Sequence, residues 1–359
     1  MRIYYLDGIR GWAAISVLLF HLLLEIFGFF SIDYKINYLY LLIDGPLAVL
    51  IFFIISGDSL HTIFLSNNEK KITSVIIKRY FRLAGPIIVT SFIVYIIMKL
   101  NINYNYEAGY IVKKPLWLSS FLLFEPNIYE MLKFSISHVF IFGEYNNSYN
   151  PLLWPIKYEF FGSIFIFIYG LIYKNLKYPI LSLIILFIYF FALGSYYALF
   201  ISGMIISILR KMNFFSILEM YIKGYTAIFL LLLIFIIDYI LYYFKIRNLR
   251  LLIIYSIFIV IILYSSVDCQ RFMSSTFSRF LGKISYLIYC IQFPLIISYT
   301  SWLIVKFQSK IDNFEIILLI ISSSVILAIV ISYCLYFFEK LYLQTLDKKI
   351  LVIINEKKE

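Results

Sequence analysis

The first apolar stretch of the chain contains polar side chains whose types and spacing could do chemistry. In the string YLDGIRGWAAISVLLFHLLLEIF, Arg10 and His21 are eleven residues apart. At 100° per residue, they fall within about 20° of one helix face, and they are roughly 16 Å apart along the axis. Asp7 and Glu25 extend the same stripe at spacings of three and four residues. One helix face therefore carries a cation near one end and an imidazole deeper in the apolar run.

The imidazole of His21 is the side chain best suited to catalysis. Imidazole exchanges a proton near neutral pH, so His21 could act as a general base or carry an acyl group. The alternative is a structural His that is hydrogen-bonded to a neighbouring helix. Because ionisable groups are costly inside membrane spans, a cation on the same face favours the functional interpretation. We expect His61, at a loop edge, and His138, in an irregular segment, to be structural.

A second group of candidates lies in the string KRYFRLAGP. Arg79 and Arg82 are three residues apart at the predicted start of a span, so both guanidinium groups lie on one helical face. Guanidinium groups bind phosphate oxygens in a bidentate manner, and Lys78 adds a point charge. The alternative is that these cations only fix orientation and contact anionic lipid headgroups.

The third candidate is Glu159 in the string NPLLWPIKYEFFG. It lies at the predicted outer entrance of a span, close to Trp154 and Tyr158. A carboxylate there could hold a sugar hydroxyl or assist proton transfer, and the aromatic rings offer a surface for sugar stacking. An interfacial aromatic belt with an exposed Glu is the alternative.

The composition indicates which elements must position these residues. Of 359 residues, 63% are hydrophobic and only 14% are charged, and the mean hydropathy is +0.91. A water-soluble globule cannot hide so much apolar surface, and abundant Phe and Tyr exclude disorder. The formal net charge of +11 comes largely from cations between apolar runs, which is not the pattern of nucleic-acid binding. Three cysteines without CxxC spacing indicate neither disulfides nor a metal site.

We therefore predict an all-α, polytopic membrane helix bundle with about ten spans. A span needs about 20 mostly apolar residues. The runs that qualify or nearly do are 9–30, 40–60, 83–100, 157–173, 178–193, 196–209, 225–244, 250–267, 284–305 and 314–338. The segment 116–142 is ambiguous, because Pro115, Pro126 and Glu125 interrupt it. It could be re-entrant or interfacial, and the orientation given below holds provided that it does not cross. One membrane domain over 1–345 and a basic cytoplasmic tail over 346–359 complete the prediction.

Basic loops predict the orientation of the spans. The positive-inside rule places the following cations, and with them both termini, in the cytoplasm: Lys70, Lys71, Lys78, Arg79, Arg82, Lys174, Lys177, Arg210, Lys211, Arg271, Arg279 and Lys283. One cluster, with Lys245, Arg247 and Arg250, falls on the outer side instead. The first run contains Arg10 and lacks a small-residue cleavage site, which indicates a retained span.

The opening string resembles the acyltransferase-3 family of membrane acyltransferases, whose signature is Arg, ten residues, then His. Arg10 and His21 match it, and Arg79 and Arg82 match the family's Arg-x-x-Arg. Other resemblances run along nearly the whole chain: GPLAVLIFFIISG, LLWPIKYEFFG, GKISYLIYCIQFP and FFEKLY. Three positions depart from the family pattern. Gln292 stands where a His is usual, Asp58 follows SG in place of an apolar residue, and Pro86 comes slightly later than in the family.

The resemblance implies transfer of an acyl group, usually acetyl, from cytoplasmic acyl-CoA to a carbohydrate on the far side of the membrane. Cations Lys78, Arg79, Arg82 and Arg10 would then hold the donor's phosphates. His21 would deprotonate the acceptor or carry the acyl group, and Glu159 would orient the acceptor. The acceptor would be a bacterial surface polysaccharide or its lipid-linked precursor, and the protein would lie in the inner membrane.

Two other functions remain open from the residues alone. A flippase or transporter for lipid-linked glycans would carry polar residues on several spans that line a path, whereas here they are concentrated on one. A glycan polymerase would carry a large outward loop rich in Arg, and the longest polar loop, 101–115, has none.

Overall fold

The computed structural model describes residues 3–28, 43–66, 69–143 and 147–356, and every regular element in those ranges is a helix. This confirms the predicted all-α class. The ends of the predicted spans 9–30 and 40–60 fall partly outside the described residues. So do the last residues of the basic tail and the side chains of Lys70, Lys71 and Lys174, on which the predicted orientation partly depends.

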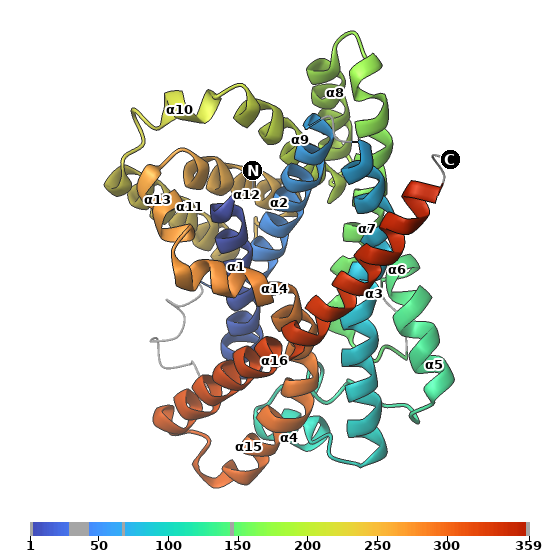
Figure 1. Cartoon of the computed structure of the whole chain (residues 1–359). Coiled ribbons are helices and arrows are strands. Elements are labelled where there is room, and N and C mark those ends of the chain that lie inside the picture. Colours follow the sequence, from blue (N-terminus) through green and yellow to red (C-terminus); the bar gives the residue numbers. More distant parts are fainter. Residues whose placement is uncertain (1–2, 29–42, 67–68, 144–146, 357–359) are drawn as a thin grey trace. The chain divides into compact units, whose positions relative to one another are not determined.

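The longer helices are α1 (Tyr4–Leu19), α2 (Gly45–Leu65), α3 (Glu69–Lys99), α7 (Pro155–Ile172), α8 (Pro179–Ala192), α9 (Tyr197–Lys211), α11 (Gly224–Tyr243), α12 (Leu249–Tyr264), α14 (Thr276–Leu295) and α16 (Phe314–Glu356). The shorter helices are α4 (Asn105–Ile111), α5 (Ile128–Lys133), α6 (Val139–Ile141), α10 (Phe214–Leu218), α13 (Val267–Met273) and α15 (Ser301–Lys306). Three π-helical segments are η1 (Phe20–Ile26), η4 (Phe134–His138) and η7 (Ile296–Thr300). Figure 1 labels the α-helices and colours them in chain order.

Each of the ten predicted spans corresponds to a helix, but not every helix is long enough to cross a membrane. In the described residues, seven are long and apolar enough, and α12 with α13, bent by 93°, would make an eighth. The predicted spans 178–193 and 196–209 form α8 and α9, of 14 and 15 residues. At 1.5 Å per residue these helices reach only about 21–23 Å, against roughly 30 Å of hydrocarbon. They lie side by side as a hairpin whose turn contains Gly194 at φ +62°.

The segment 116–142 contains turns and the short helices α5, η4 and α6. None of these is long enough to be a candidate span. The interruption by Pro126 and Glu125 agrees with this result, because the chain is extended at Asn127 before α5 begins. This arrangement is the one that the predicted orientation requires.

The outer cluster that disagreed with the positive-inside rule has local partners. Nε of Arg247 lies 2.9 Å from the carboxylate of Asp238, and Arg250 donates a hydrogen bond of 2.7 Å to the carbonyl of Ala192. The ion pair neutralises one of the three cations, which weakens the conflict with the rule. Orientation itself remains a prediction.

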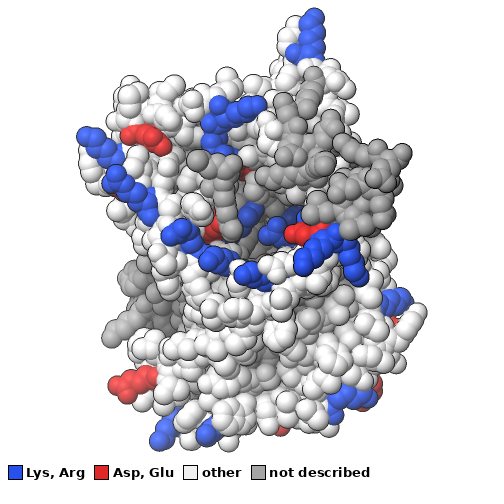
Figure 2. All heavy atoms as spheres, in the orientation of Figure 1, with Lys and Arg blue, Asp and Glu red and all other residues white. Residues whose placement is uncertain are grey.

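Large apolar side chains on α11 are exposed, which suits a helix in contact with lipid. They are Ile228, Phe229, Leu232, Leu233 and Ile236. Figure 2 shows charged side chains in separate groups, with broad uncharged surface between them. This distribution fits a chain whose main solvent is hydrocarbon.

The chain divides into two compact units, each described here by itself. Unit 1 comprises Met1–Ala13, Pro46–Ile77 and Tyr158–Lys283, and unit 2 comprises Ala14–Gly45, Lys78–Lys157 and Ile284–Glu359. The core of unit 1 contains buried side chains such as Ile54, Phe200, Ile253 and Tyr264, and that of unit 2 contains Leu22, Leu118, Leu153, Phe293 and Ile304. The prediction of one domain over 1–345 with a tail stays a prediction, although α16 runs through that boundary to Glu356.

Glycines allow α1 to approach α14 closely within unit 1. A Cβ atom on Gly11 would lie 2.6 Å from the backbone nitrogen of Gly282. A Cβ atom on Gly282 would lie 2.1 Å from the carbonyl oxygen of Asp7. A Cβ atom on Gly8 would lie 1.9 Å from the carbonyl oxygen of Met273, the last residue of α13. Backbones therefore touch at this crossing, which is the close approach that small residues permit between membrane helices.

Gly11→Ala is expected to destabilise the protein by about 1–3 kcal/mol, because the added methyl group meets backbone that cannot turn aside. Thermal unfolding in detergent would measure the loss. Gly85→Ala is the matched control. Its Cβ would meet only the ring of Tyr342, at 3.0 Å, and the gain in helix propensity offsets a small shift. Equal melting temperatures for both variants would contradict the proposed importance of the crossing.

Candidate functional site

His21 lies in a π-helical turn. The predicted common face of Arg10 and His21 assumed a regular α-helix with 100° per residue. The α-helix ends at Leu19, and residues Phe20–Ile26 continue it with the wider π geometry. Such turns inside α-helices frequently occur at functional sites. The helix that carries both Arg10 and His21 is thus continuous over Tyr4–Ile26, with a change of helical geometry just before the imidazole.

The ring of His21 stacks on the indole of Trp117 in unit 2. Their centroids are 5.8 Å apart and their planes differ by 19°. The Nδ1 atom of His21 is inaccessible to solvent and has no hydrogen-bond partner among the described residues. A stacked face fixes the ring plane while leaving the nitrogen atoms at its edge, which is the arrangement that proton or acyl transfer needs.

The loop that carries Trp117 is held by hydrogen bonds to α4. The buried amide of Asn105 donates to the carbonyls of Leu118 and Phe121, at 3.1 and 3.0 Å. Ser119 donates to the carbonyl of Tyr106 at 2.7 Å. Trp117 is therefore positioned by polar contacts that link residues 13 to 16 apart in sequence. Sequence reasoning missed this Trp because its loop shows no helical periodicity.

The predicted phosphate-binding cations lie inside helix α3, not at its start. The helix begins at Glu69, well before the apolar stretch, because the basic segment is itself helical. Lys78 forms an ion pair with Asp347 of α16. Arg79 is half-buried, whereas Arg82 is exposed and interacts electrostatically with Glu339 of α16. These cations belong to unit 2, and acidic groups on α16 balance two of them.

In unit 1, two serines of α2 connect the other predicted residues by a chain of hydrogen bonds. Arg10 donates to the hydroxyl of Ser59 at 2.5 Å and to the carbonyl of Ile55 at 3.4 Å. Ser59 donates in turn to the carbonyl of Ser56 at 3.3 Å, and the hydroxyl of Ser56 donates to the carboxylate of Glu159. The structure thus brings Arg10 and Glu159 to the two ends of one short polar chain.

The aromatic neighbours of Glu159 are partly used in packing. Tyr158 makes an edge contact with Tyr196, at 4.7 Å between centroids, and a tilted one with Tyr197 at 6.0 Å. Tyr158 therefore belongs to an aromatic cluster of unit 1. Sugar stacking by this ring remains a prediction.

A buried ion pair on α2 involves the unusual Asp58. Its side chain is fully buried, forms an ion pair with Arg210 of α9, and accepts a hydrogen bond of 2.7 Å from the hydroxyl of Tyr264. Arg210 also donates to Thr62 at 2.8 Å. The sequence flagged Asp58 but counted Arg210 only as a topology signal. The structure shows instead that the cation compensates the buried carboxylate.

The two other histidines pack within the helical core. His61 is not at a loop edge but is fully buried inside α2, where Nδ1 lies 2.7 Å from the hydroxyl of Ser207. The apolar residues that follow it extend the helix to Leu65. His138 is buried in η4 and makes an edge contact with Phe142.

Gln292, the departure from the family's His, is fully buried on α14. Neither polar atom of its side chain has a partner among the described residues. Its neighbour Cys290 accepts a hydrogen bond of 3.1 Å from the amide of Asn150 through its carbonyl. An amide here keeps a donor and an acceptor in the core but cannot change its charge.

The predicted site residues therefore fall into two sets. Arg10 and Glu159 belong to unit 1, and His21, Lys78, Arg79 and Arg82 belong to unit 2. Their roles in catalysis and donor binding remain predictions. Among the residues that the structure describes, no group of three His, Cys, Asp or Glu side chains could hold a metal ion.

Fold and geometry together define a helical integral-membrane protein with an imidazole and several cations on its spans. A family model described as an acyltransferase domain matches residues 3–334. The chain therefore belongs to the acyltransferase-3 family, and the resemblance seen in the sequence is confirmed. This assignment supports membrane acyltransferase activity. Comparisons with curated proteins and with solved structures gave no match.

Trp117→Ala is expected to lower the kcat of acyl transfer at least about tenfold, because the imidazole of His21 loses the ring that fixes its plane. Trp117→Phe should retain most of the activity, since it keeps an aromatic face. Steady-state kinetics on the purified protein would separate kcat from KM. Trp302→Ala on α15 serves as the control tryptophan. If Trp117→Ala kept its kcat and changed only stability, the positioning role would be excluded.

Proposed function

We propose that this protein is a membrane O-acyltransferase that moves an acyl group, acetyl in the simplest case, from cytoplasmic acyl-CoA to a carbohydrate hydroxyl. The observation that carries the proposal is the imidazole of His21. It lies inside a candidate span, is stacked on Trp117, and has a solvent-inaccessible Nδ1 atom without a partner in the described residues. An ionisable group in that position is costly unless it is used.

The donor would bind through its phosphates. Arg79 and Arg82 are three residues apart on α3, with Lys78 next to them, and Arg10 lies on the helix that carries His21. Asp347 and Glu339 on α16 would balance Lys78 and Arg82 in the absence of donor. Guanidinium groups are suited to this exchange because they bind carboxylates and phosphates with the same bidentate geometry.

His21 could act in either of two ways. As a general base, it takes the proton of the acceptor hydroxyl while the oxygen attacks the thioester carbonyl carbon. The new C–O bond replaces the C–S bond, and the proton passes to the departing CoA sulfur. As a relay, the imidazole nitrogen attacks the thioester carbonyl carbon, the C–S bond breaks, and CoA leaves as the thiol with the proton of the ring. The hydroxyl oxygen then attacks the acyl carbon, the C–N bond breaks, and the hydroxyl proton returns to the ring.

The acceptor would be oriented by Glu159. Its carboxylate is bound to Ser56, which links it through Ser59 to Arg10. Because Ser56 fixes its rotamer, the carboxylate would accept a hydrogen bond from a sugar hydroxyl in one defined direction.

We propose that the acceptor is a bacterial surface polysaccharide or its lipid-linked precursor. The protein would lie in the inner membrane with both termini in the cytoplasm. Only the neutral acyl group would then cross, and the CoA anion would stay outside hydrocarbon.

Membership of an acyltransferase family favours this proposal over the two alternatives, a flippase or transporter and a glycan polymerase. Neither alternative requires CoA. Transfer of label from radioactive acetyl-CoA to host glycan fractions by the purified protein is the direct test of donor and acceptor.

His21→Ala and His21→Gln are both expected to abolish acyl transfer while the protein still inserts and accumulates. Gln preserves most of the volume of the ring but neither titrates nor accepts an acyl group. The matched control is His138→Ala, which removes another buried imidazole. The measurement is transfer of label from acetyl-CoA, normalised to membrane-extracted protein. Full activity of both His21 variants would refute the proposed mechanism.

Arg79→Ala with Arg82→Ala should raise the KM for acyl-CoA about tenfold or more and change kcat less, because charge-assisted contacts to the donor are lost. A control with the same change in net charge is Arg250→Ala with Arg271→Ala, at two exposed positions. An unchanged KM in the first double variant would leave these cations as topology signals only.

A further inference from the structure

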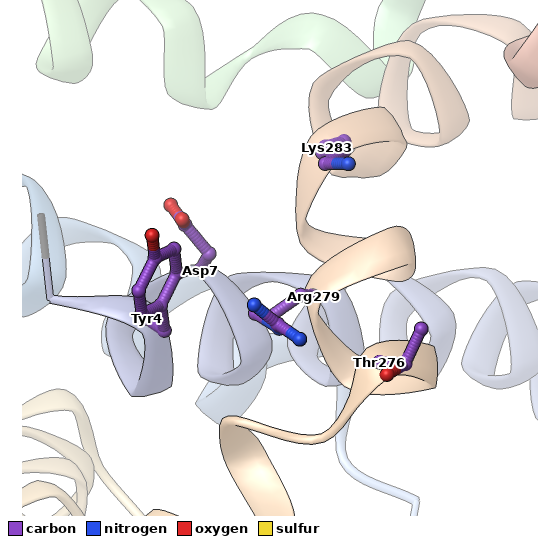
Figure 3. A pocket seen from close by; sticks show the side chains of 5 residues that line it. All are labelled: Tyr4, Asp7, Thr276, Arg279 and Lys283. Atoms are coloured by element: carbon purple, nitrogen blue, oxygen red, sulfur yellow. The ribbon is translucent and has the colours of Figure 1, made fainter.

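A pocket in unit 1 lies outside the residues that the sequence assigned to the site. It has a volume of about 330 Å³ and is lined by Tyr4, Asp7, Thr276, Arg279 and Lys283 (Figure 3). Two of these residues come from the first turns of α1 and three from α14. Known ligand pockets occupy about 300–1,000 Å³, so this one would take one end of a large ligand.

The lining residues form two facing stripes. On α14, Thr276, Arg279 and Lys283 are three and seven residues apart, which puts them on one face of the helix. On α1, Tyr4 and Asp7 are three residues apart. The close glycine contact between Gly11 and Gly282 holds the two helices together next to the pocket. The pocket is therefore built by a rigid helix crossing and not by a loop.

The guanidinium of Arg279 is oriented before any ligand binds. Its central carbon lies 5.0 Å from the centroid of the Tyr4 ring, in a cation–π contact. The Nε atom of Arg279 is inaccessible to solvent and has no hydrogen-bond partner among the described residues. Lys283, one turn further along α14, is exposed and lines the same pocket. Two cations with two hydroxyl groups, from Tyr4 and Thr276, are the groups that bind phosphate esters.

Asp7 limits the strength of this attraction. One carboxylate opposes the two cations, so the pocket keeps a surplus of one positive charge. A carboxylate would repel a phosphate but would accept hydrogen bonds from the amino group or hydroxyls of a nucleotide. Such a mixture favours a nucleotide phosphate over inorganic phosphate alone.

We propose that this pocket binds a phosphate of the nucleotide end of coenzyme A. The inference rests on the proposed function, since it gives the proposed acyl-CoA donor a point of attachment within unit 1. Arg279 and Lys283 bind the phosphate, and Tyr4 and Thr276 donate hydrogen bonds to it. Asp7 lines the pocket, and Arg10 is three residues further along α1. A donor held in the pocket would therefore extend along the helix toward Arg10.

The test measures binding without catalysis. Full-length protein in nanodiscs of phosphatidylcholine is titrated with radiolabelled CoA, which has no acyl group to transfer, and with dephospho-CoA. Arg279→Gln and Lys283→Gln should each weaken CoA binding at least about tenfold, which is the change expected for loss of a hydrogen bond to a charged group. Lys223→Gln, at an exposed lysine outside the pocket, is the matched control and should bind like the wild type. Lys283→Arg keeps the positive charge that Lys283→Gln removes, so it should bind CoA like the wild type.

The outcomes separate the two proposals. If the wild type binds no CoA, the proposed donor is wrong. If the wild type binds CoA and both pocket variants bind it equally well, with unchanged melting temperatures, only the pocket assignment is wrong. Repeating the titration in phosphatidylglycerol nanodiscs covers the other source of phosphate. Loss of bound anionic lipid in the variants, with unchanged CoA affinity, would assign the pocket to a lipid headgroup and overturn the proposal.

Discussion

The cost of keeping a polar side chain in hydrocarbon is the constraint on which the structure depends. Two charged side chains of unit 1, Asp58 and Arg10, have partners supplied by other helices. Asp58 is compensated by Arg210 and by the hydroxyl of Tyr264, and Arg10 is bound to Ser59. These contacts also fix which helix faces meet, because a partner in the wrong register would leave a charge unpaired. Polar groups here specify the packing of otherwise uniformly apolar helices.

The imidazole of His21 has an aromatic neighbour in place of a polar partner in the described part of the chain. Its ring is held by stacking on Trp117, and its Nδ1 atom has no hydrogen-bond partner among the described residues. Gln292 has the same property on α14. Buried polar atoms without a partner are uncommon in folded proteins. Under the proposed function, the substrate would supply the partner that the Nδ1 atom of His21 lacks.

Small residues and polar contacts together explain how an apolar chain makes a defined site. At Gly11 and Gly282, backbones touch, and this crossing positions the pocket with Arg279 and Lys283. At Asn105, one amide holds the loop that presents Trp117. At the crossing, glycines set the position of Arg279 and Lys283, and at α4 one asparagine sets the position of Trp117. Van der Waals packing and the release of lipid hold the helices together, but these glycine and asparagine contacts determine which residues of neighbouring helices meet.

The sequence by itself determined the helical membrane class, the family, and the pairing of Arg10 with His21 on one helix. Such features are local, since hydropathy and spacing within a single segment encode them. Tertiary structure alone decided that Trp117 stacks on His21 and that Arg210 compensates Asp58. Each of these contacts joins residues far apart in the chain, and spacing along one helix carries no information about which residue of another helix it will meet.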